Sequence, residues 1–311
     1  MKCDTAGMNG LLNILKPPGM TSHDVVNYVR RLAGIKKVGH TGTLDPGAAG
    51  VLLVCCGNAT RIIEYLDHDK EYRAEITFGA SSSTGDSFGQ LKPGEMPSGF
   101  SKKMVDETIS GFTGEVSQVP PMTSAVRHQG KKLYELARQG KVVERRARTV
   151  NIYSIEVAWW YEGPASPRAL LDVRCSAGTY IRTLCHDIGE KLGCGAYMSF
   201  LLRTGAGSHK IDRSVTLEEL NGLAGSGELP KAMLSVEDAL SFLPVVEIKS
   251  EAVKSVGSGA MLYPPGIKSM QGEIREGKMA VLIGMGKLVA MARAVADDNG
   301  RICFKPEKVM V

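Results

Sequence analysis

Glycine and proline interrupt this 311-residue sequence so often that it can form only short helices and strands joined by turns. The chain contains 36 Gly and 14 Pro, and they gather in a few segments. A Pro-Pro-Gly turn spans 17–19, a Gly-rich loop covers 39–50, Ser, Gly and Pro dominate 80–99, and a second Pro-Pro pair ends at 121. The apolar runs between these breaks are far too short to cross a bilayer.

The spacing of apolar residues between the breaks predicts the individual elements. Alternating or continuous apolar runs predict strands, and spacings of three and four predict helices. Thr21 or Ser22 can cap the first helix, with Asp24 in its first turn and Gly34 as its stop. We expect strands at 11–15, 51–54, 72–78, 150–160, 169–175, 279–284, 288–294 and 302–305, helices at 22–33, 58–66, 102–112, 131–139 and 181–192, and a loop at 80–99.

Composition excludes several classes of protein without choosing a function. A hydrophobic content of 43% argues against disorder, and 38 Lys and Arg against 33 Asp and Glu leave a net charge of only +5. The seven cysteines include no C-x-x-C pair, so reduced thiols are favoured over a zinc site. The first ten residues lack the apolar core of a signal peptide. We therefore expect a cytoplasmic protein with no metal site.

One short stretch carries more positive charge than the whole chain has in surplus. Residues 127–148 contain eight Lys and Arg and two Glu, a local net of 8 − 2 = +6. Such a run is usually a solvated face, but it could also be an arm that contacts phosphates. Composition does not decide between these interpretations. The basic residues are Arg127, Lys131, Lys132, Arg138, Lys141, Arg145, Arg146 and Arg148.

Asp45 lies inside the Gly-rich loop, where a lone Asp usually forms a turn or caps a helix. Pro46 fixes the chain after it, and the glycines would let a substrate approach the backbone closely. No Gly-Lys-Ser or Gly-Lys-Thr follows, and the loop is not a dinucleotide fingerprint, so a phosphate-cradling enzyme is not supported. On these residues alone, a structural and a catalytic role for Asp45 both stay open.

A series of motifs, in the same order along the chain, resembles the TruB family of pseudouridine synthases. They cover about Gly10 to Arg203, and the sequence beyond Val245 is more weakly similar to the small RNA-binding PUA-like domain of such proteins. The motifs are Lys16-Pro17-x-Gly19-x-Thr21-Ser22-x-Asp24, Gly39-His40-Thr41-Gly42-Thr43-Leu44-Asp45-Pro46-x-Ala48-x-Gly50, Asp69-Lys70-x-Tyr72, Gln118-Val119-Pro120-Pro121 with Ser124-Ala125 and Gly130-Lys131-x-Leu133-Tyr134-Glu135, Cys175-Ser176-x-Gly178-Thr179-Tyr180-Ile181-Arg182, and Leu202-Arg203.

The resemblance implies an isomerase that converts the T-loop uridine of tRNA, called position 55, into pseudouridine. That reaction breaks the C1′–N1 bond, turns the uracil and joins C5 to C1′, and positive charge gathers on the sugar in its transition state. Asp45 would stabilise or capture this charge, and Arg182 would hold the carboxylate ionised and oriented. Attack on the ribose and attack on the base stay open as alternatives. No metal or organic cofactor is implied.

The resemblance also implies roles for the residues around Asp45. An enzyme that works on a stacked base must extrude it, which requires a pocket for the base and a side chain to fill the gap. Tyr72 would stack on the uracil and help remove the C5 proton, His40 would fill the gap, Tyr180 and Leu202 would complete the pocket, Lys16 and Pro17 would support the loop, Asp86 would orient the arginine, and the basic arm would close over the RNA.

Two positions depart from the family pattern. Thr123 stands where an aromatic residue is frequent, which puts a local packing contact in doubt. Thr204 follows Arg203 where a second Arg is common, which removes one possible phosphate contact. The pair Trp159-Trp160 fits none of the motifs, and sheet packing is its expected role.

The fold implied by the resemblance is α+β: a mixed, largely antiparallel sheet with flanking helices, followed by a small β-rich PUA-like domain. We expect the catalytic domain at 1–243, with the arm at about 119–150, and the second domain at 244–311. The partner would be the T arm of tRNA, with no membrane, guide RNA or protein partner needed, and the protein would be a monomer.

Two alternatives of other classes stay open. One is an RNA-binding or tRNA-folding protein with vestigial chemistry, which the joint presence of Asp45, Tyr72 and Arg182 argues against. The other is a guide-RNA-dependent synthase, which the long arm argues against, because the arm supplies RNA contacts that partners would otherwise provide.

Overall fold

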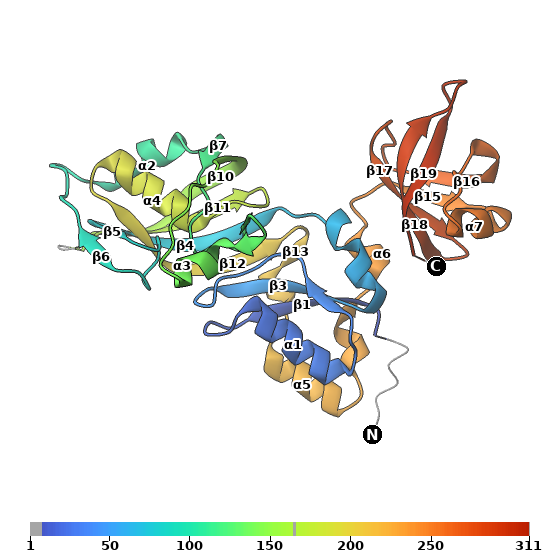
Figure 1. Cartoon of the computed structure of the whole chain (residues 1–311), viewed down its shortest axis with the longest axis horizontal. Helices are drawn as coiled ribbons and strands as arrows, with labels where there is room; N and C mark the ends of the chain where they lie inside the picture. Colours follow the sequence, from blue (N-terminus) through green and yellow to red (C-terminus); the bar gives the residue numbers. More distant parts are fainter. Residues whose placement is uncertain (1–7, 164–165, 311) are drawn as a thin grey trace.

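The computed structural model describes residues 8–163 and 166–310, which form two large sheets, two short two-stranded ribbons and the helices packed around them (Figure 1). The larger sheet has ten strands, with the path β14-β1-β3-β12-β4-β11-β10-β7, and with β2 on β3 and β13 on β12. The smaller sheet has five strands in the order β16-β15-β17-β18-β19. Only the β3–β12 and β15–β17 pairs of these sheets are parallel. The expected α+β fold, mixed and largely antiparallel, is confirmed.

The strands of the larger sheet and its attached ribbons are β1 Gly10–Lys16, β2 Val38–His40, β3 Ala49–Cys56, β4 Lys70–Phe78, β5 Ala80–Ser82, β6 Leu91–Pro93, β7 Gly114–Gln118, β8 Arg127–His128, β9 Lys131–Lys132, β10 Arg148–Tyr161, β11 Arg168–Cys175, β12 Ala196–Ala206, β13 His209–Lys210 and β14 Met233–Leu234. The helices among them are α1 Ser22–Ala33, η2 Gly57–Tyr65, α2 Lys102–Ser110, α3 Leu133–Arg138, α4 Ile181–Leu192, η3 Ile211–Arg213, α5 Leu217–Gly225, η4 Leu229–Ala232 and α6 Val236–Ala239. The rest of the chain forms β15 Val245–Ile248, α7 Ser250–Gly257, η5 Pro264–Gly266, β16 Ile267–Gln271, β17 Met279–Gly284, β18 Lys287–Ala296 and β19 Ile302–Val309.

The first helix forms where its sequence signals predict it. The Thr21 hydroxyl accepts the Asp24 amide at 3.0 Å, and the Asp24 carboxylate accepts the Thr21 amide at 2.8 Å, which completes a capping box. Gly34 ends the helix in the left-handed region, at φ 66°. The apolar face of α1 is buried, and this fixes the approach of the chain to the Gly-rich loop.

Strand β12 was not expected from the sequence, and it is central to the sheet. It pairs antiparallel with β4 and parallel with β3, which follows the Gly-rich loop. The contact with β3 is very close: a Cβ on Gly50 would lie 2.2 Å from the Arg203 carbonyl oxygen, and Gly50 has φ +115°. Only glycine fits there, and the close contact brings Arg203 to the loop.

Several smaller expectations need correction. The segment 80–99 was expected to be a loop, but it contains the two-stranded ribbon β5–β6. The sequence of these strands lacks the apolar alternation by which a strand is recognised. The helix expected at 131–139 is only α3, because 131–132 pairs with β8 in a short hairpin. The segment 58–66 forms a 3₁₀ helix, and α5 was not expected.

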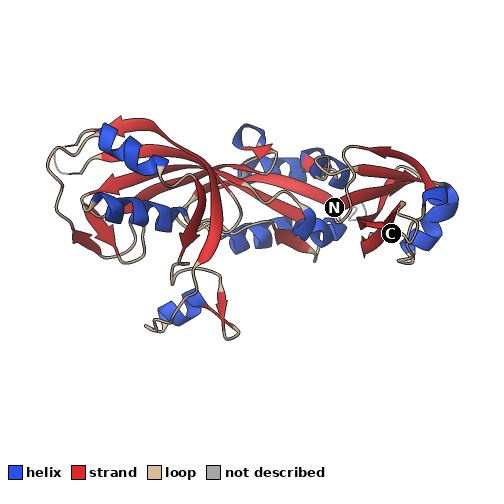
Figure 2. Cartoon of the chain, turned by 90° about the horizontal axis from the view of Figure 1, so that it is seen from above, coloured by secondary structure: helices blue, strands red, loops and turns tan. Residues whose placement is uncertain are grey.

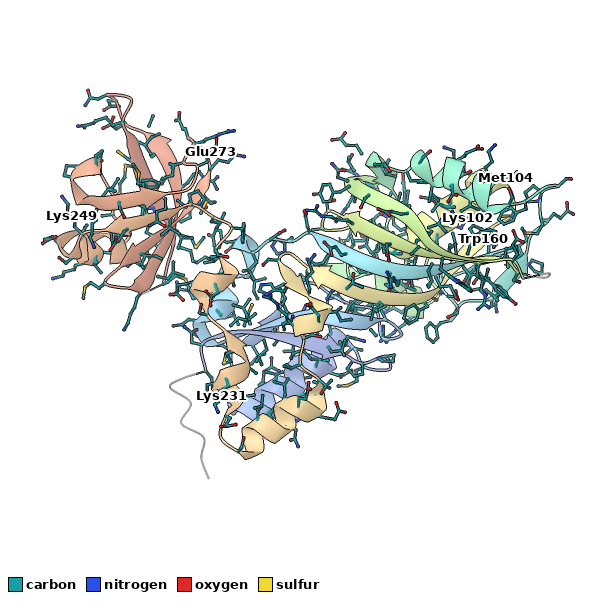
Figure 3. All side chains as sticks on the ribbon, turned by 180° about the vertical axis from the view of Figure 1, so that it is seen from behind. Lys102, Met104, Trp160, Lys231, Lys249 and Glu273 are labelled. Carbon is teal, nitrogen blue, oxygen red and sulfur yellow. The ribbon has the colours of Figure 1, made fainter. Side chains whose placement is uncertain are left out.

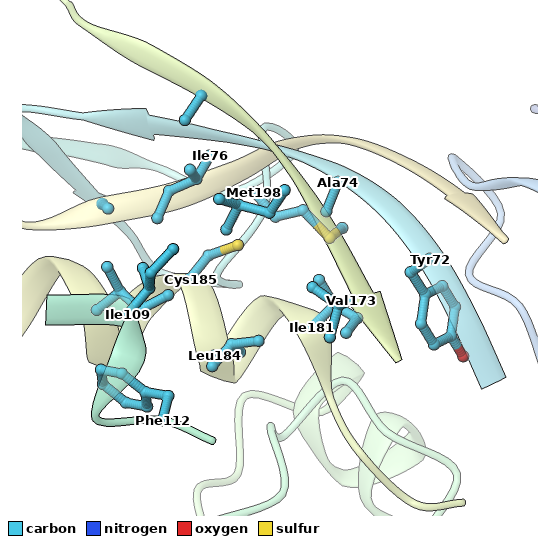
Figure 4. Packing of buried hydrophobic residues seen from close by; sticks show 14 of the residues in the cluster. Tyr72, Ala74, Ile76, Ile109, Phe112, Val173, Ile181, Leu184, Cys185 and Met198 are labelled. Carbon is cyan, nitrogen blue, oxygen red and sulfur yellow. The ribbon is translucent and has the colours of Figure 1, made fainter. Parts of the chain in front are cut away.

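A large apolar core lies between the sheet and the helices α2 and α4 (Figure 4). Inward-facing residues of β4, β11 and β12 pack against Val105 and Ile109 of α2 and against Ile181, Leu184 and Ile188 of α4. Trp160 also packs on this core, as expected for sheet packing, while its neighbour Trp159 is 51% exposed. Tyr72 lies at one end of the cluster (Figure 4).

The smaller sheet is joined to the larger one by a shared apolar cluster. In this cluster, Leu11 of β1 and Ile62 of η2 belong to the larger part, whereas Val281, Leu288 and Met291 belong to the smaller sheet. Lys249 and Glu273 of the smaller part lie far from Lys102, Met104 and Trp160 at the opposite end of the molecule (Figure 3). None of the helices within 8–163 and 166–310 is long and apolar enough to span a membrane.

Candidate active site

The Gly-rich loop between β2 and β3 holds Asp45 against side chains from several other elements. The Arg182 Nε lies 3.0 Å from Asp45 Oδ2, and its Nη2 donates to Asp45 Oδ1 at 3.4 Å. Arg182, in the first turn of α4, is 5% exposed, whereas the Asp45 side chain keeps 36% of its surface exposed. The pair is thus sealed on the arginine side and open to a substrate on the carboxylate side.

The protonation of Asp45 depends on opposing influences. Burial of the carboxyl group raises its pKa, the Arg182 guanidinium opposes that rise, and the Asp86 carboxylate adds to it. A carboxylate that is held partly desolvated beside a fixed cation is suited to stabilise positive charge on a substrate.

Arg182 is held in place by groups on two further segments. Its Nη1 donates to the Thr84 carbonyl at 3.2 Å and lies 3.7 Å from Asp86 Oδ2. The arginine also donates to the Thr123 hydroxyl, and its Nη2 donates to the Thr123 carbonyl at 3.3 Å. Asp86 therefore lies beside Arg182, the neighbour that the resemblance implied for it. Thr123, a departure from the family pattern, connects the arm directly to the arginine.

The backbone of the loop is fixed by buried side chains from outside it. Lys16 Nζ donates to the carbonyls of Pro46 and Ala48, at 3.3 and 2.6 Å. The Ser22 hydroxyl accepts the Leu44 amide at 2.8 Å and donates to the Leu44 carbonyl at 3.2 Å. Buried backbone groups must find partners, and these contacts supply them immediately beside Asp45. The support expected from Lys16 is present, and Ser22 adds to it.

Arg203 holds the other side of the loop and was missed as a site residue. Its Nε donates to the Val51 carbonyl at 2.6 Å, its Nη2 to Gly42 at 3.1 Å and its Nη1 to Thr43 at 3.4 Å. The side chain is 1% exposed, and it forms no salt bridge among the described residues. Its place in the Leu202-Arg203 motif was the available signal, but its partners depend on the parallel β3–β12 pairing.

Two buried lysines lie near Arg203 and complete a cationic environment behind the loop. Burial, and then the Arg203 charge, lower the pKa of Lys16 to about 8, and the same two causes lower the pKa of Lys70 to about 8. Lys70 Nζ donates to the His68 carbonyl at 2.6 Å. The Lys16 charge favours the ionised form of Asp45.

Tyr72 lies on the buried face of β4, opposite Arg203 in the β4–β12 ladder. Its side chain is 9% exposed, and burial raises its pKa, against the opposing influence of Arg203. Tyr72 is therefore a neutral phenol at the edge of the apolar core, an environment that suits stacking on a base.

His40 contributes to the loop itself. The Gly42 amide donates to His40 Nδ1 at 3.2 Å, so the neutral ring carries its proton on Nε2. Burial and the Arg203 charge lower the pKa of His40, which keeps the imidazole neutral.

The structure does not bring Leu202 to the face of Tyr72. Leu202 pairs with Arg73, which points to the opposite face of the sheet and forms a salt bridge with exposed Asp172. Directly paired residues share a face, so Leu201, which pairs with inward-facing Ala74, takes the expected position. The expectation for Leu202 was one residue out of register.

Tyr180 occupies the N-cap position of α4, two residues before Arg182. The Gln118 side chain forms two hydrogen bonds with the Tyr180 backbone. Its Oε1 accepts the Tyr180 amide at 2.9 Å, and its Nε2 donates to the Tyr180 carbonyl at 3.2 Å. Gln118 is 1% exposed and stands at the start of the arm, so it fixes α4 and the arm to each other.

The arm projects from the body of the sheet as the β8–β9 hairpin and α3 (Figure 2). None of its eight basic residues forms a salt bridge within the described chain. Arg145 differs from the others, because it donates to the Pro120 carbonyl at 3.1 Å and its Nε is buried. The exposed ones are Arg127, Lys131, Arg138, Lys141, Arg146 and Arg148, and Lys132 is half-buried.

The cysteines that could have suggested zinc are buried thiols of the apolar core. Burial raises the pKa of Cys175 to about 11 and that of Cys185 to about 12. Such thiols stay protonated and are poor metal ligands. Cys3 lies outside the described residues.

Sequence profiles of known families match almost the whole chain. The profile for the N-terminal domain of TruB family pseudouridylate synthases matches residues 30–181. The profile of the tRNA pseudouridylate synthase B C-terminal domain matches 182–241, and that of the PUA domain matches 244–299.

Full-length relatives and solved structures agree with these profiles. The chain is 53% identical to tRNA pseudouridine synthase B of Pelotomaculum thermopropionicum, over 97% of each chain. It is 45% identical to the Moorella thermoacetica protein of the same name, over 97% of this chain and 99% of that one. A Cbf5-Nop10-Gar1 complex contains a similar structure at 32% identity and a TM-score of 0.76, covering 100% of this chain and 88% of that one. An H/ACA RNP bound to a substrate RNA with 2′-deoxyuridine gives 30% identity and a TM-score of 0.74, over 97% of this chain and 85% of that one.

Proposed function

Because this chain belongs to the TruB family of pseudouridylate synthases and is an isomerase that acts on uridine in tRNA, we propose that its target is the T-loop uridine at position 55 and that Asp45 is its catalytic carboxylate. The observation that carries this proposal is the Asp45–Arg182 pair, buried on one side and open on the other. A pure RNA-binding protein would gain nothing from placing a partly desolvated carboxylate towards an anionic substrate.

The proposed chemistry assigns each group a step. As the C1′–N1 bond breaks, positive charge gathers on the sugar and Asp45 stabilises or captures it, while Arg182 keeps the carboxylate oriented. The uracil leaves with the electron pair of the C1′–N1 bond and turns, and C5 then bonds to C1′. The C5 proton passes to solvent, and N1 takes up a proton, so that the product is an isomer of the substrate. Tyr72, a neutral phenol, stacks on the uracil, and Leu201 rather than Leu202 completes the pocket with Tyr180.

We propose that the protein acts without a guide RNA. The solved relatives named above are parts of guide complexes, but here the arm itself reaches the site, since Thr123 contacts Arg182. The exposed arm cations would contact phosphates, at about 1 kcal/mol or less each at physiological salt. His40 would fill the gap left by the extruded base.

The proposed organisation is a catalytic domain at 1–243, with an arm at about 119–150, and an RNA-binding domain at 244–311. The change of sheet between β14 and β15 supports this division. We further propose a monomer that works in the cytoplasm, on tRNA and without a cofactor.

The test is tritium release from a T-arm stem-loop labelled at C5 of its T-loop uridine, with purified protein and nothing else added. We expect stoichiometric release by the wild type, and none by Asp45→Asn at an RNA affinity within several-fold of normal. Asp172→Asn is the matched control, because Asp172 is an exposed partner of Arg73 on the opposite face. Release by Asp45→Asn near the wild-type rate would remove Asp45 from its role. Tight binding without release by the wild type would favour a folding role or a missing guide.

A further inference from the structure

Phe88 is a large apolar side chain exposed directly beside the active-site loop. It keeps 78% of its surface exposed, in a segment dominated by Ser and Gly. Its ring edge lies against Gly47, two residues after Asp45: a Cβ on Gly47 would lie 2.4 Å from Phe88 Cε2 and 2.7 Å from Cζ. One edge of the ring therefore touches the loop, and most of the rest faces solvent.

The backbone of Phe88 is fixed by the same residue that approaches Arg182. Asp86 Oδ1 accepts the Phe88 amide at 3.1 Å and the Thr84 hydroxyl at 2.5 Å, while Asp86 Oδ2 faces Arg182 Nη1 at 3.7 Å. The Ser82 hydroxyl donates to the Asp86 carbonyl at 2.5 Å. The exposed ring is thus carried by a hydrogen-bonded turn whose position is tied to that of the catalytic pair.

An exposed aromatic ring beside the reacting loop of an RNA site has a clear physical use. Every base has an apolar face. When a base stacks on an aromatic side chain, both apolar faces leave water, and this burial stabilises the complex. Extruding one uridine also deprives its neighbours of a stacking partner. A ring beside the loop can replace the lost contact.

We propose that Phe88 is a stacking platform for an unpaired base of the substrate RNA that flanks the extruded uridine. The inference rests on the proposed function, because it takes the Asp45 loop to be the place where the uridine reacts. It assigns Phe88 a role in RNA binding and substrate choice, outside the pocket formed by Tyr72 and its neighbours.

The test compares three side chains at position 88 in the full-length protein. Stem-loop affinity is measured by fluorescence anisotropy, and the chemical step by single-turnover tritium release. Phe88→Leu keeps an apolar side chain but loses the aromatic face, so we expect Kd to rise roughly 5- to 100-fold, with the saturated rate within about threefold of normal. Phe88→Trp should bind at least as tightly as the wild type. Phe242→Leu is the matched control, since Phe242 is also an exposed phenylalanine (48%) and lies outside the proposed RNA-binding domain, between α6 and β15.

A second measurement identifies stacking itself. We measure the Kd of the wild type and of Phe88→Leu for a set of stem-loops, each with an abasic site at one of the unpaired positions that flank the target uridine. We expect one abasic position at which the two proteins bind equally, because the stacked base is then already missing. Equal affinity of both proteins for the intact stem-loop would overturn the proposal. An affinity loss of the same size on every abasic substrate, or a lower saturated rate with unchanged Kd, would also overturn it, by showing that the ring only supports Gly47.

These outcomes stay separate from failure of the proposed function. If the wild type releases no tritium, the proposed reaction fails, whereas the anisotropy and abasic measurements still report whether Phe88 contacts a base.

Discussion

Removing the buried Arg203 guanidinium should slow the chemical step far more than it destabilises the protein. We consider Arg203→Met, which keeps an unbranched apolar stem. The change removes hydrogen bonds to the carbonyls of Val51, Gly42 and Thr43. Bonds that involve a charged group contribute about 1.5–3 kcal/mol each. The bonds at 2.6 and 3.1 Å are of normal length and the third, at 3.4 Å, is weak, so the gross loss is about 3–6 kcal/mol.

An opposing effect offsets much of that loss. Burying a charge without an ionic partner costs several kcal/mol, and Met avoids this cost. Repulsion of Lys16 and Lys70 also disappears, so their pKa values, lowered to about 8, should rise towards the ordinary value. We therefore expect the free energy of unfolding to change by no more than about 2 kcal/mol. The loop carrying Asp45, however, loses its anchor on one side, and a misplacement of about 1 Å can cost about a hundredfold in rate.

The assay is single-turnover tritium release with enzyme in excess, which isolates the chemical step, alongside urea unfolding. We expect a rate about 100-fold below normal for Arg203→Met. Arg203→Lys should fall between it and the wild type, because one ammonium cannot span three carbonyls. Arg174→Met is the control, since Arg174 is exposed and packs over the Tyr153 ring. A rate for Arg203→Met within threefold of the wild type would refute the argument, as would a rate loss fully explained by unfolding.

Three further perturbations test other parts of the site. Asp45 acts when ionised, so the rate should fall as pH falls through its pKa, which burial raises above the ordinary range of an aspartate; because Asp86 adds to that rise, Asp86→Asn should move this acid limb to lower pH, and a shift to higher pH would contradict the electrostatic argument. His40→Asn keeps an acceptor for the Gly42 amide and His40→Leu does not, so calorimetry should show His40→Leu melting about 2–4 °C lower; equal melting temperatures would mean that the bond contributes nothing. Ser22→Ala leaves the amide before Asp45 without a partner, which should cost about 1–3 kcal/mol in urea unfolding, and an unchanged midpoint would show that water replaces the hydroxyl.

The sequence predicted those parts of the site that depend on local order. The helix cap at Thr21, the loop around Asp45 and the α4 helix that carries Arg182 all follow from short patterns of residue types. The pairing of Asp45 with Arg182 was expected from the resemblance, and the structure brings the two together.

The remaining parts depend on contacts between distant segments. Strand β12 has bulges and no clean alternation, so neither its existence nor the face of Leu201 was readable from the pattern. The role of Arg203 follows from a parallel pairing with Gly50. Thr123 gained its role because the arm folds back on Arg182, a contact that no local spacing specifies.

The cluster that joins the two sheets has a consequence for how the protein is made. Leu11 of β1 leaves the ribosome well before Leu288 and Met291 of β18, with which it shares this cluster. Loop closure over such a distance is slow and costly in entropy. The apolar side chains of β1 and η2 therefore stay uncovered until β17 and β18 have been synthesised. A chain that stops before β17 should reach the cell as an aggregating fragment rather than as a smaller working enzyme.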